Sequence, residues 1–166
     1  TDAAATTSTN LVHPGGGMGL SLTGAGMFIG EWDGGDVRTT HDEFTNTGAS
    51  RVVDMDGISS LSNHATHVGG TLIGGGADPN ALGMAYEAEL YAYDWNDDFS
   101  ETADAASNGL LIGNYSYGYI SGWRYDSDLD EWEWFGDPSI SNEEDYNFGF
   151  YTWACEIVDD IAFNAA

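Results

Sequence analysis

The sequence has no lysine and three arginines, Arg38, Arg51 and Arg124, against 28 acidic side chains, so its formal net charge is −25. Nucleic-acid binding relies on clustered Lys and Arg side chains that neutralise phosphates. Anionic membrane surfaces attract proteins through the same cations. The composition therefore excludes nucleic acid as a direct partner and disfavours docking onto an anionic membrane. An acidic surface without lysine suits a protein that works in salt, which is a hypothesis about habitat and not about activity.

Cysteine and long apolar runs are also scarce. Cys155 is the single cysteine, so no intrachain disulfide can form. The longest apolar stretches are a few residues long, as at 110–112, so we expect no transmembrane helix and no membrane insertion. Residues 1–10 lack the basic and apolar regions of a signal peptide, which fits a mature or truncated chain as well as a cytoplasmic one.

What the chain does contain is enough apolar material to fold. The hydrophobic fraction is 42% and the aromatic fraction 13%, which is too high for a disordered acidic tail. A chain of 166 residues normally forms one domain with a sizeable core. We therefore expect a single folded unit over 1–166, in which residues 1–26 are an irregular, glycine-rich lead-in.

Strand and helix patterns alternate along the chain. Strands are predicted at 27–32, 89–94 and 110–116, helices at about 64–73 and 101–108, and an irregular stretch from 118 to about 147. A final helix has Trp153, Ile157 and Ile161 on one face. This alternation predicts an α/β fold with three layers, in which helices flank a mainly parallel sheet.

The first convincing helix has clear boundary signals. Asn63 is the expected N-cap, Val68 and Leu72 follow at four-residue spacing, and the glycines at 74–76 end the helix. His64 then lies at the N-terminus of this helix, and Asp33 at the carboxyl end of the first strand. In a parallel sheet, functional groups gather at these two kinds of position.

Asp33 and His64 are therefore a candidate acid–base pair. An aspartate bonded to one imidazole nitrogen fixes the tautomer and leaves the other nitrogen free as a general base. The small residues at 34–35, 65 and 69–70 would let the backbones approach closely and leave room for a substrate. On spacing alone, an ordinary turn aspartate next to a histidine in a capping region explains the same residues equally well.

Five segments together carry a resemblance to a known family. They are 29–35 (Ile-Gly-Glu-Trp-Asp-Gly-Gly), 64–71 (His-Ala-Thr-His-Val-Gly-Gly-Thr), 82–85 (Leu-Gly-Met-Ala), 89–95 (Glu-Leu-Tyr-Ala-Tyr-Asp-Trp) and 114–118 (Asn-Tyr-Ser-Tyr-Gly). The first two resemble the Asp motif (I-x-D-x-G) and the His motif (H-G-T-H-V-A-G-T) of the subtilisin-like serine proteases, the peptidase S8 family. Among these, the chain is most similar to secreted enzymes of environmental Bacteroidetes.

The resemblance implies roles for individual residues. Asp33 would be the orienting acid, His64 the general base, and His67 a structural neighbour one helical turn further on. Ser116, Tyr117 and Gly118 would match the strand that lines the substrate cleft. There, an extended peptide pairs with the backbone as an added strand.

The sequence departs from the family pattern in two ways. Ala65 and Gly69 replace the small residues Gly and Ala of the His motif. More importantly, no Gly-Thr-Ser follows His64, although subtilases use the order Asp, His, Ser with the nucleophile in that motif. We therefore expect the serine and the oxyanion-hole asparagine to lie beyond Ala166, and the chain to be the N-terminal portion of a catalytic domain.

Other patterns give weaker alternatives. Ser116 lies in a near match to the nucleophile elbow G-x-S-x-G, but that fold places its histidine after the serine, and all four histidines here precede Ser116. His64 and His67, with Asp33, His41 or Asp42, have a spacing that a metal site would allow. The remaining alternatives lie in the irregular stretch. The spacing of Asp126, Asp128 and Asp130 matches the first positions of a calcium-binding loop, but the glycine that such a loop requires is missing. The stretch also contains aromatic residues that suit either a binding platform or the packing of a loop, namely Trp123, Trp132, Trp134 and Phe135.

The sequence thus predicts part of a secreted, serine-type endopeptidase that acts on polypeptides. It requires no cofactor for catalysis, and structural calcium is compatible with the family. As given, the chain is expected to be inactive because it lacks the nucleophile. The alternative from a different class is a non-catalytic, calcium-dependent binding or adhesion module on a degenerate protease fold.

Overall fold

The structure is a computed structural model that describes residues 2–57 and 60–165. The chain divides into two compact units, one formed by the chain up to Ser116 and one by Tyr117–Asn164.

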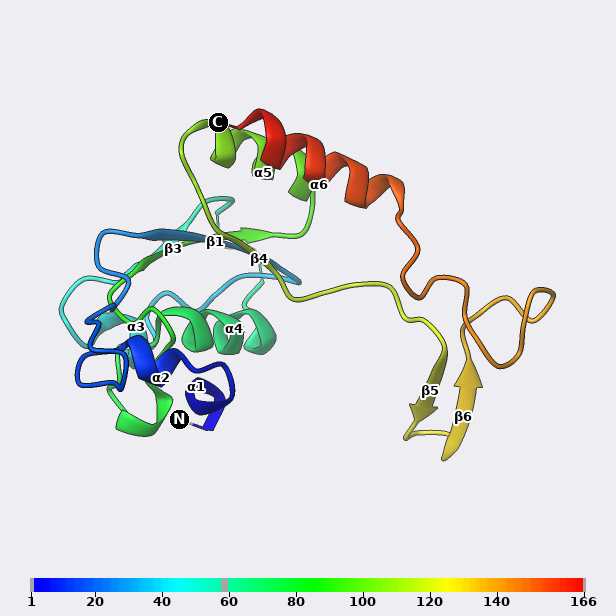
Figure 1. Cartoon of the computed structure of the whole chain (residues 1–166), viewed down its shortest axis with the longest axis horizontal. Coiled ribbons are helices and arrows are strands. Elements are labelled where there is room, and N and C mark those ends of the chain that lie inside the picture. The colour runs from blue at the N-terminus through cyan, green and yellow to red at the C-terminus, as the bar shows by residue number, and fades with distance from the viewer. Residues whose placement is uncertain (1, 58–59, 166) are drawn as a thin grey trace. The chain divides into compact units, whose positions relative to one another are not determined.

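The first unit is built on a four-stranded parallel sheet with the strand order β2-β3-β1-β4. Its elements are α1 (Asp2–Thr6), α2 (Thr9–Val12), β1 (Phe28–Asp33), α3 (Asp42–Thr45), β2 (Val52–Asp54), α4 (Asn63–Ile73), the 3₁₀ turn η1 (Pro79–Ala81), β3 (Glu89–Asp94), α5 (Asp98–Ser107) and β4 (Gly113–Tyr115). Helix α4 lies on one face of the sheet and α5 on the other (Figure 1). The three-layer α/β fold with a parallel sheet is therefore confirmed.

The central strands hold the fold in register. β1 pairs with β3 along its whole length, from Phe28 opposite Glu89 to Asp33 opposite Asp94. The two strands therefore end level, and Asp33 lies at the carboxyl edge of the sheet. This is the edge at which open parallel sheets carry functional groups.

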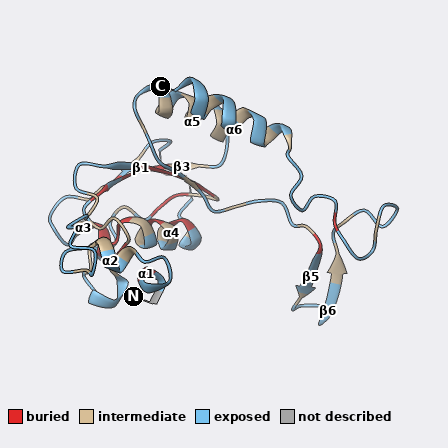
Figure 2. Cartoon of the chain, viewed as in Figure 1, coloured by how far each residue is buried: buried red, intermediate tan, exposed pale blue. Residues whose placement is uncertain are grey.

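The core of this unit lies between the sheet and the α3–α4 layer. Its buried members are Ile29, Val37, Phe44, Val52, Ala65, Ile73, Ala88, Leu90 and Ala92. Figure 2 shows these buried stretches on β1, β3 and α4. The buried residues of α4 are Ala65, Gly69 and Ile73, and the half-buried Leu72 also packs against this core. The small residues Ala65 and Gly69 let the helix approach the strands closely.

Several predicted boundaries are wrong in detail. Strand β2 was not predicted, because its three residues are too short to show a periodicity. The strand predicted at 110–116 is shortened to β4, with Leu111 and Ile112 exposed before it. The lead-in 1–26 contains the short helices α1 and α2. Helix α5 begins three residues before the predicted Glu101.

The second unit contains β5 (Trp123–Asp126), β6 (Glu131–Trp134) and α6 (Trp153–Asn164). The predicted final helix is present, but the stretch expected to be irregular contains an antiparallel hairpin of β5 and β6. Asp145 is buried in this unit, and its carboxylate accepts hydrogen bonds from the backbone N–H groups of Gly122 (2.7 Å) and Asn147 (3.0 Å). In the part of the chain that the structure describes, no helix has the length and apolarity to cross a membrane.

Candidate functional site

The end of β1 holds the first residue of the candidate site. Asp33 is the last residue of the strand and is 2% exposed. Its Oδ1 accepts a hydrogen bond from the backbone N–H of Gly34 at 2.7 Å. The chain then turns sharply through Gly35, whose φ is 106°, and a Cβ at this position would lie 2.8 Å from the carbonyl oxygen of Ser60. Glycine is therefore required where the strand leaves the site.

The first turn of α4 holds the second residue. The helix is capped by Ser62, whose Oγ accepts from the N–H of Ala65 at 3.1 Å, so the predicted cap Asn63 is wrong by one residue. Ser62 is itself fixed by its N–H, which donates to the carbonyl of Asp36 at 2.8 Å. A hydroxyl that satisfies an otherwise unpaired N–H is the usual helix start. The cap thereby sets the position of His64, the second residue of the helix.

Asp33 and His64 are in direct contact, as the sequence predicted. The Nδ1 atom of His64 lies 2.8 Å from both carboxylate oxygens of Asp33. The two side chains differ in exposure, since that of Asp33 is 3% exposed and that of His64 is 61% exposed. Because a carboxylate only accepts hydrogen bonds, Nδ1 carries the proton and Nε2 is left as the free basic nitrogen. The arrangement can take a proton from a group on the solvent side.

Glu31 lies behind this pair and was not recognised from the sequence. Its side chain is fully buried, and neither carboxyl oxygen has a hydrogen-bond partner. Burial, followed by the charge of Asp33, raises the pKa of Glu31 from 4.5 to about 8. The signal was present in the strand pattern, because Ile29, Glu31 and Asp33 alternate onto one face.

The opposite face of β1 is locked by aromatic stacking. The Trp32 ring lies nearly parallel to those of Tyr93 and Tyr115, with centroid distances of 4.5 and 5.0 Å. Its Nε1–H donates to Glu101 of α5 at 3.1 Å. Burial, followed by the charge of Asp56, raises the pKa of Glu101 to about 7. These contacts fix the strand that carries Asp33 from the side away from α4.

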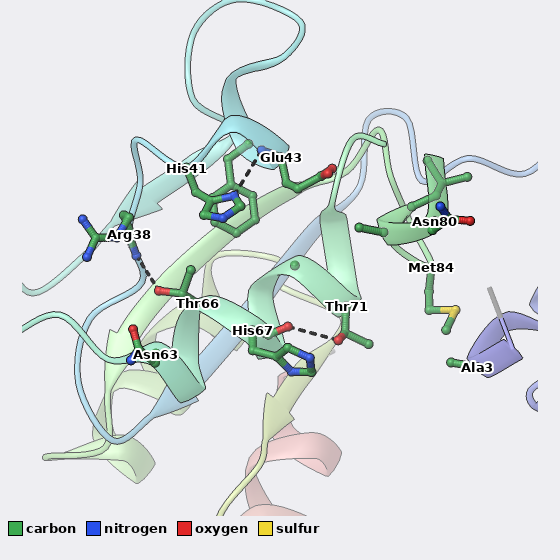
Figure 3. A pocket seen from close by; sticks show the side chains of 14 residues that line it. Ala3, Arg38, His41, Glu43, Asn63, Thr66, His67, Thr71, Asn80 and Met84 are labelled. Atoms are coloured by element: carbon green, nitrogen blue, oxygen red, sulfur yellow. Dashed lines mark hydrogen bonds between the residues drawn. The ribbon is translucent and has the colours of Figure 1, made fainter. Parts of the chain in front are cut away.

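A separate cavity of about 590 Å³ lies beside α4. Figure 3 shows Arg38, His41 and His67 around it, with the N–H of Arg38 bonded to Thr66 Oγ1 at 3.0 Å. Asp33 and His64 do not line this cavity. His64 thus turns its Nδ1 to Asp33 while His67 faces the cavity. Among the residues that the structure describes, no three His, Cys, Asp or Glu side chains are grouped so as to hold a metal ion.

The predicted substrate-binding residues lie after β4. Strand β4 ends at Tyr115, so Ser116 is one residue beyond it and is the last residue of the first unit. The Oγ of Ser116 accepts a hydrogen bond from Asn114 Nδ2 at 2.9 Å. Tyr117 and Gly118 open the second unit. Their role in substrate binding stays a prediction.

The acidic and aromatic alternatives both fall on the hairpin. Asp126 Oδ1 accepts the backbone N–H groups of Asp128 (2.8 Å) and Leu129 (3.1 Å), so its carboxylate shapes the turn between the strands. The aromatic rings pair across the strands, Trp123 with Trp134 and Tyr125 with Trp132. The sequence could have shown this, because aromatic residues alternate with polar ones in both strands.

Comparison with known proteins identifies the family of the segment that carries this site. The sequence profile described as the subtilase family matches residues 29–150, a range that includes Asp33, His64 and all four strands of the parallel sheet except the first residue of β1. A search of curated proteins finds no significant match. The profile match covers well over half of the chain, and the chain therefore belongs to the subtilase family of serine peptidases.

Proposed function

We propose that Asp33 and His64 are the acid and base of a serine-type endopeptidase, and that a segment outside this chain supplies the nucleophilic serine. The observation that carries the proposal is the 2.8 Å contact between His64 Nδ1 and a buried Asp33 within the matched family range. The absence of Gly-Thr-Ser after His64 in the sequence is the reason for placing the serine elsewhere.

The proposed steps of peptide hydrolysis follow from the buried position of Asp33 and the exposed position of His64. Nε2 of His64 accepts the proton of the serine hydroxyl as the serine attacks the peptide carbonyl carbon. The imidazolium that forms is stabilised by Asp33, and it then protonates the leaving amine. Water hydrolyses the acyl-enzyme in the second half of the reaction, with His64 again as the base. The exposure of His64 leaves its Nε2 side accessible to a serine and a substrate.

Substrate binding is proposed from the family resemblance. Ser116, Tyr117 and Gly118 would pair with an extended peptide as an added strand, which fits tolerance of many substrate sequences. Polypeptides are the substrates, and the protein is secreted. Catalysis needs no cofactor, although structural calcium suits the acidic loops.

Labelling with phenylmethylsulfonyl fluoride tests the proposal. The longer protein that includes the missing serine should be labelled there, and its His64→Ala variant should lose labelling because the serine is no longer activated. The present chain should not be labelled and should hydrolyse no peptide.

Three outcomes would contradict the proposal. Labelling of Ser116 in the present chain would assign the nucleophile to this segment. A longer protein without Gly-Thr-Ser and without activity would favour the non-catalytic binding module. Activity that is lost to a chelator and restored by zinc would favour a metallohydrolase.

A further inference from the structure

The carboxyl group of Glu31 is in an unusual position for an acid. Its side chain is 0% exposed, and both Oε1 and Oε2 lack a hydrogen-bond partner. It lies on β1 two residues before Asp33, so both side chains leave the same face of the strand. A buried carboxylate without donors is strongly disfavoured, whereas a neutral carboxylic acid is tolerated at much lower cost.

The backbone of α4 lies directly against this group. A Cβ on Gly69 would lie 3.0 Å from Glu31 Oε2 and 3.0 Å from Leu90 Cδ2. The same position is 3.5 Å from the ring of Phe44 on α3. Glu31 therefore lies between β1 and α4 with no room for a hydration shell.

Few charged groups face Glu31 from the neighbouring elements. On β1 it is Asp33. On β3 the register partner is Ala92, with Leu90 on one side of it and Asp94, the register partner of Asp33, on the other; on β4 the partner is Asn114. On α4 the buried face is Ala65, Gly69 and Ile73, with His64 at the helix start bonded to Asp33. On α3, Phe44 packs here, whereas the Glu43 carboxylate is held by the N–H groups of residues 76–78.

We propose that Glu31 is a positioning residue for the Asp33–His64 pair. When its carboxyl group is protonated, α4 can pack on β1 and hold His64 against Asp33; when it is ionised, this packing is lost. This inference rests on the proposed peptidase function for its effect on activity, but not for its effect on the fold. When Glu31 ionises, a second negative charge appears beside Asp33 in the same dry layer. Water must then enter between β1 and α4, and the helix that carries His64 is displaced.

The pH range of the effect follows from the direction of the shift. Burial and the Asp33 charge raise the pKa of Glu31 from 4.5 to about 8, so the folded state retains a proton that the unfolded state releases. The stabilisation by the neutral acid is complete below about pH 4.5 and is lost as the pH rises to about 8. Over that range the unfolding equilibrium constant rises up to about tenfold per pH unit because of this one proton. Above about pH 8 the fraction of correctly positioned His64 falls, by up to about tenfold per pH unit.

The first test uses the present chain and does not depend on activity. Unfolding by denaturant and the NMR signal of the His64 Nδ1 proton are followed from pH 5 to 10 in wild type, Glu31→Gln and the charge control Glu89→Gln, whose glutamate is exposed on β3. The fall in stability from pH 5 to about pH 8, and the loss of the Nδ1 signal above about pH 8, should occur in wild type and Glu89→Gln but be absent from Glu31→Gln. If Glu31→Gln fails to fold, Glu31→Leu takes its place.

The second test uses the longer protein that contains the serine. The alkaline limb of kcat/KM should move up by at least one pH unit in Glu31→Gln and stay in place in Glu89→Gln. If activity is present and the limb is the same in all three proteins, the positioning role is overturned while the peptidase proposal stands. If no protein is active but the first test gives the expected pattern, the peptidase proposal fails while the positioning role stands. An unchanged pH dependence of stability in Glu31→Gln overturns the inference outright.

Discussion

On the side of β1 that faces α4, Glu31 and Asp33 place two carboxyl groups in the interior, whereas on the side that faces α5, Trp32 lies between two tyrosine rings. Both faces are buried, but the burial of these two carboxyl groups opposes folding, whereas the burial of the stacked rings favours it. Aromatic stacking adds to the burial of apolar surface, while a buried carboxyl without donors opposes it. One strand thus combines a face that carries the candidate chemistry with a face that anchors it.

The largest expected effect is on activity, from the face toward α4. Asp33→Asn in the longer, serine-containing protein should lower kcat about 10⁴-fold, because the amide stabilises the wrong tautomer of His64 and cannot balance the imidazolium. Thermal unfolding of the same variant should stay close to wild type, because Asn is nearly isosteric and can still accept from Gly34. If Asp33→Asn unfolds as readily as a core variant, the contrast between the two faces does not hold.

The next effect is on stability, from the face toward α5. Trp32→Ala should reduce the free energy of unfolding by about 3–5 kcal/mol, because it empties a fully buried space between Tyr93 and Tyr115. Denaturant titration of the present chain measures this loss. Trp32→Phe is the matched variant, since it keeps a ring in the stack but loses the bond to Glu101, and it should cost clearly less. Equal losses would mean that the indole N–H, not the stacking, anchors the strand.

Two adjacent glycines on α4 sharpen the comparison at the helix. Gly69→Ala should cost about 1–3 kcal/mol, because its Cβ would lie 3.0 Å from Glu31 Oε2 and Leu90 Cδ2. Gly70→Ala meets no atom within 4 Å and should stabilise the helix by up to about 1 kcal/mol. Chemical denaturation of both variants gives the difference directly. Stabilisation by Gly69→Ala would show that α4 can lift away from β1 without loss.

The smallest expected effect concerns one hydroxyl on the aromatic side. Tyr115→Phe removes the 2.6 Å hydrogen bond between its hydroxyl and Thr102 Oγ1 of α5 but leaves the ring on Trp32. The expected loss is about 0.5–1.5 kcal/mol of unfolding free energy. A loss as large as that of Trp32→Ala would indicate that the hydroxyl, and not the ring, joins α5 to the sheet.

The sequence placed Asp33 at the end of β1 and His64 at the start of α4, the two kinds of position where functional groups gather in a parallel sheet. Position alone left an ordinary turn aspartate as an equal alternative, and the family motifs made the Asp33–His64 pair the stronger expectation. The sequence did not predict the burial of Glu31: the alternation places this residue on the face of Asp33, but its complete burial depends on how closely Gly69 brings α4 to β1. The hairpin was missed because the many acids between Asp126 and Glu133 obscured the alternating aromatic residues that pair across its strands.

The chain's shortage of cations has a consequence for how its loops keep their shape. Glu43 accepts three backbone N–H groups from Gly76, Ala77 and Asp78, and Asp126 and Asp145 hold their own loops in the same way. In this protein, backbone N–H groups donate the hydrogen bonds to carboxylates that lysine side chains donate in other proteins. Dissolved ions then have few attractive pairs to weaken and many repulsive ones to screen. Added salt should therefore increase the stability of this fold, whereas it weakens proteins whose surfaces are stabilised by pairs of opposite charge.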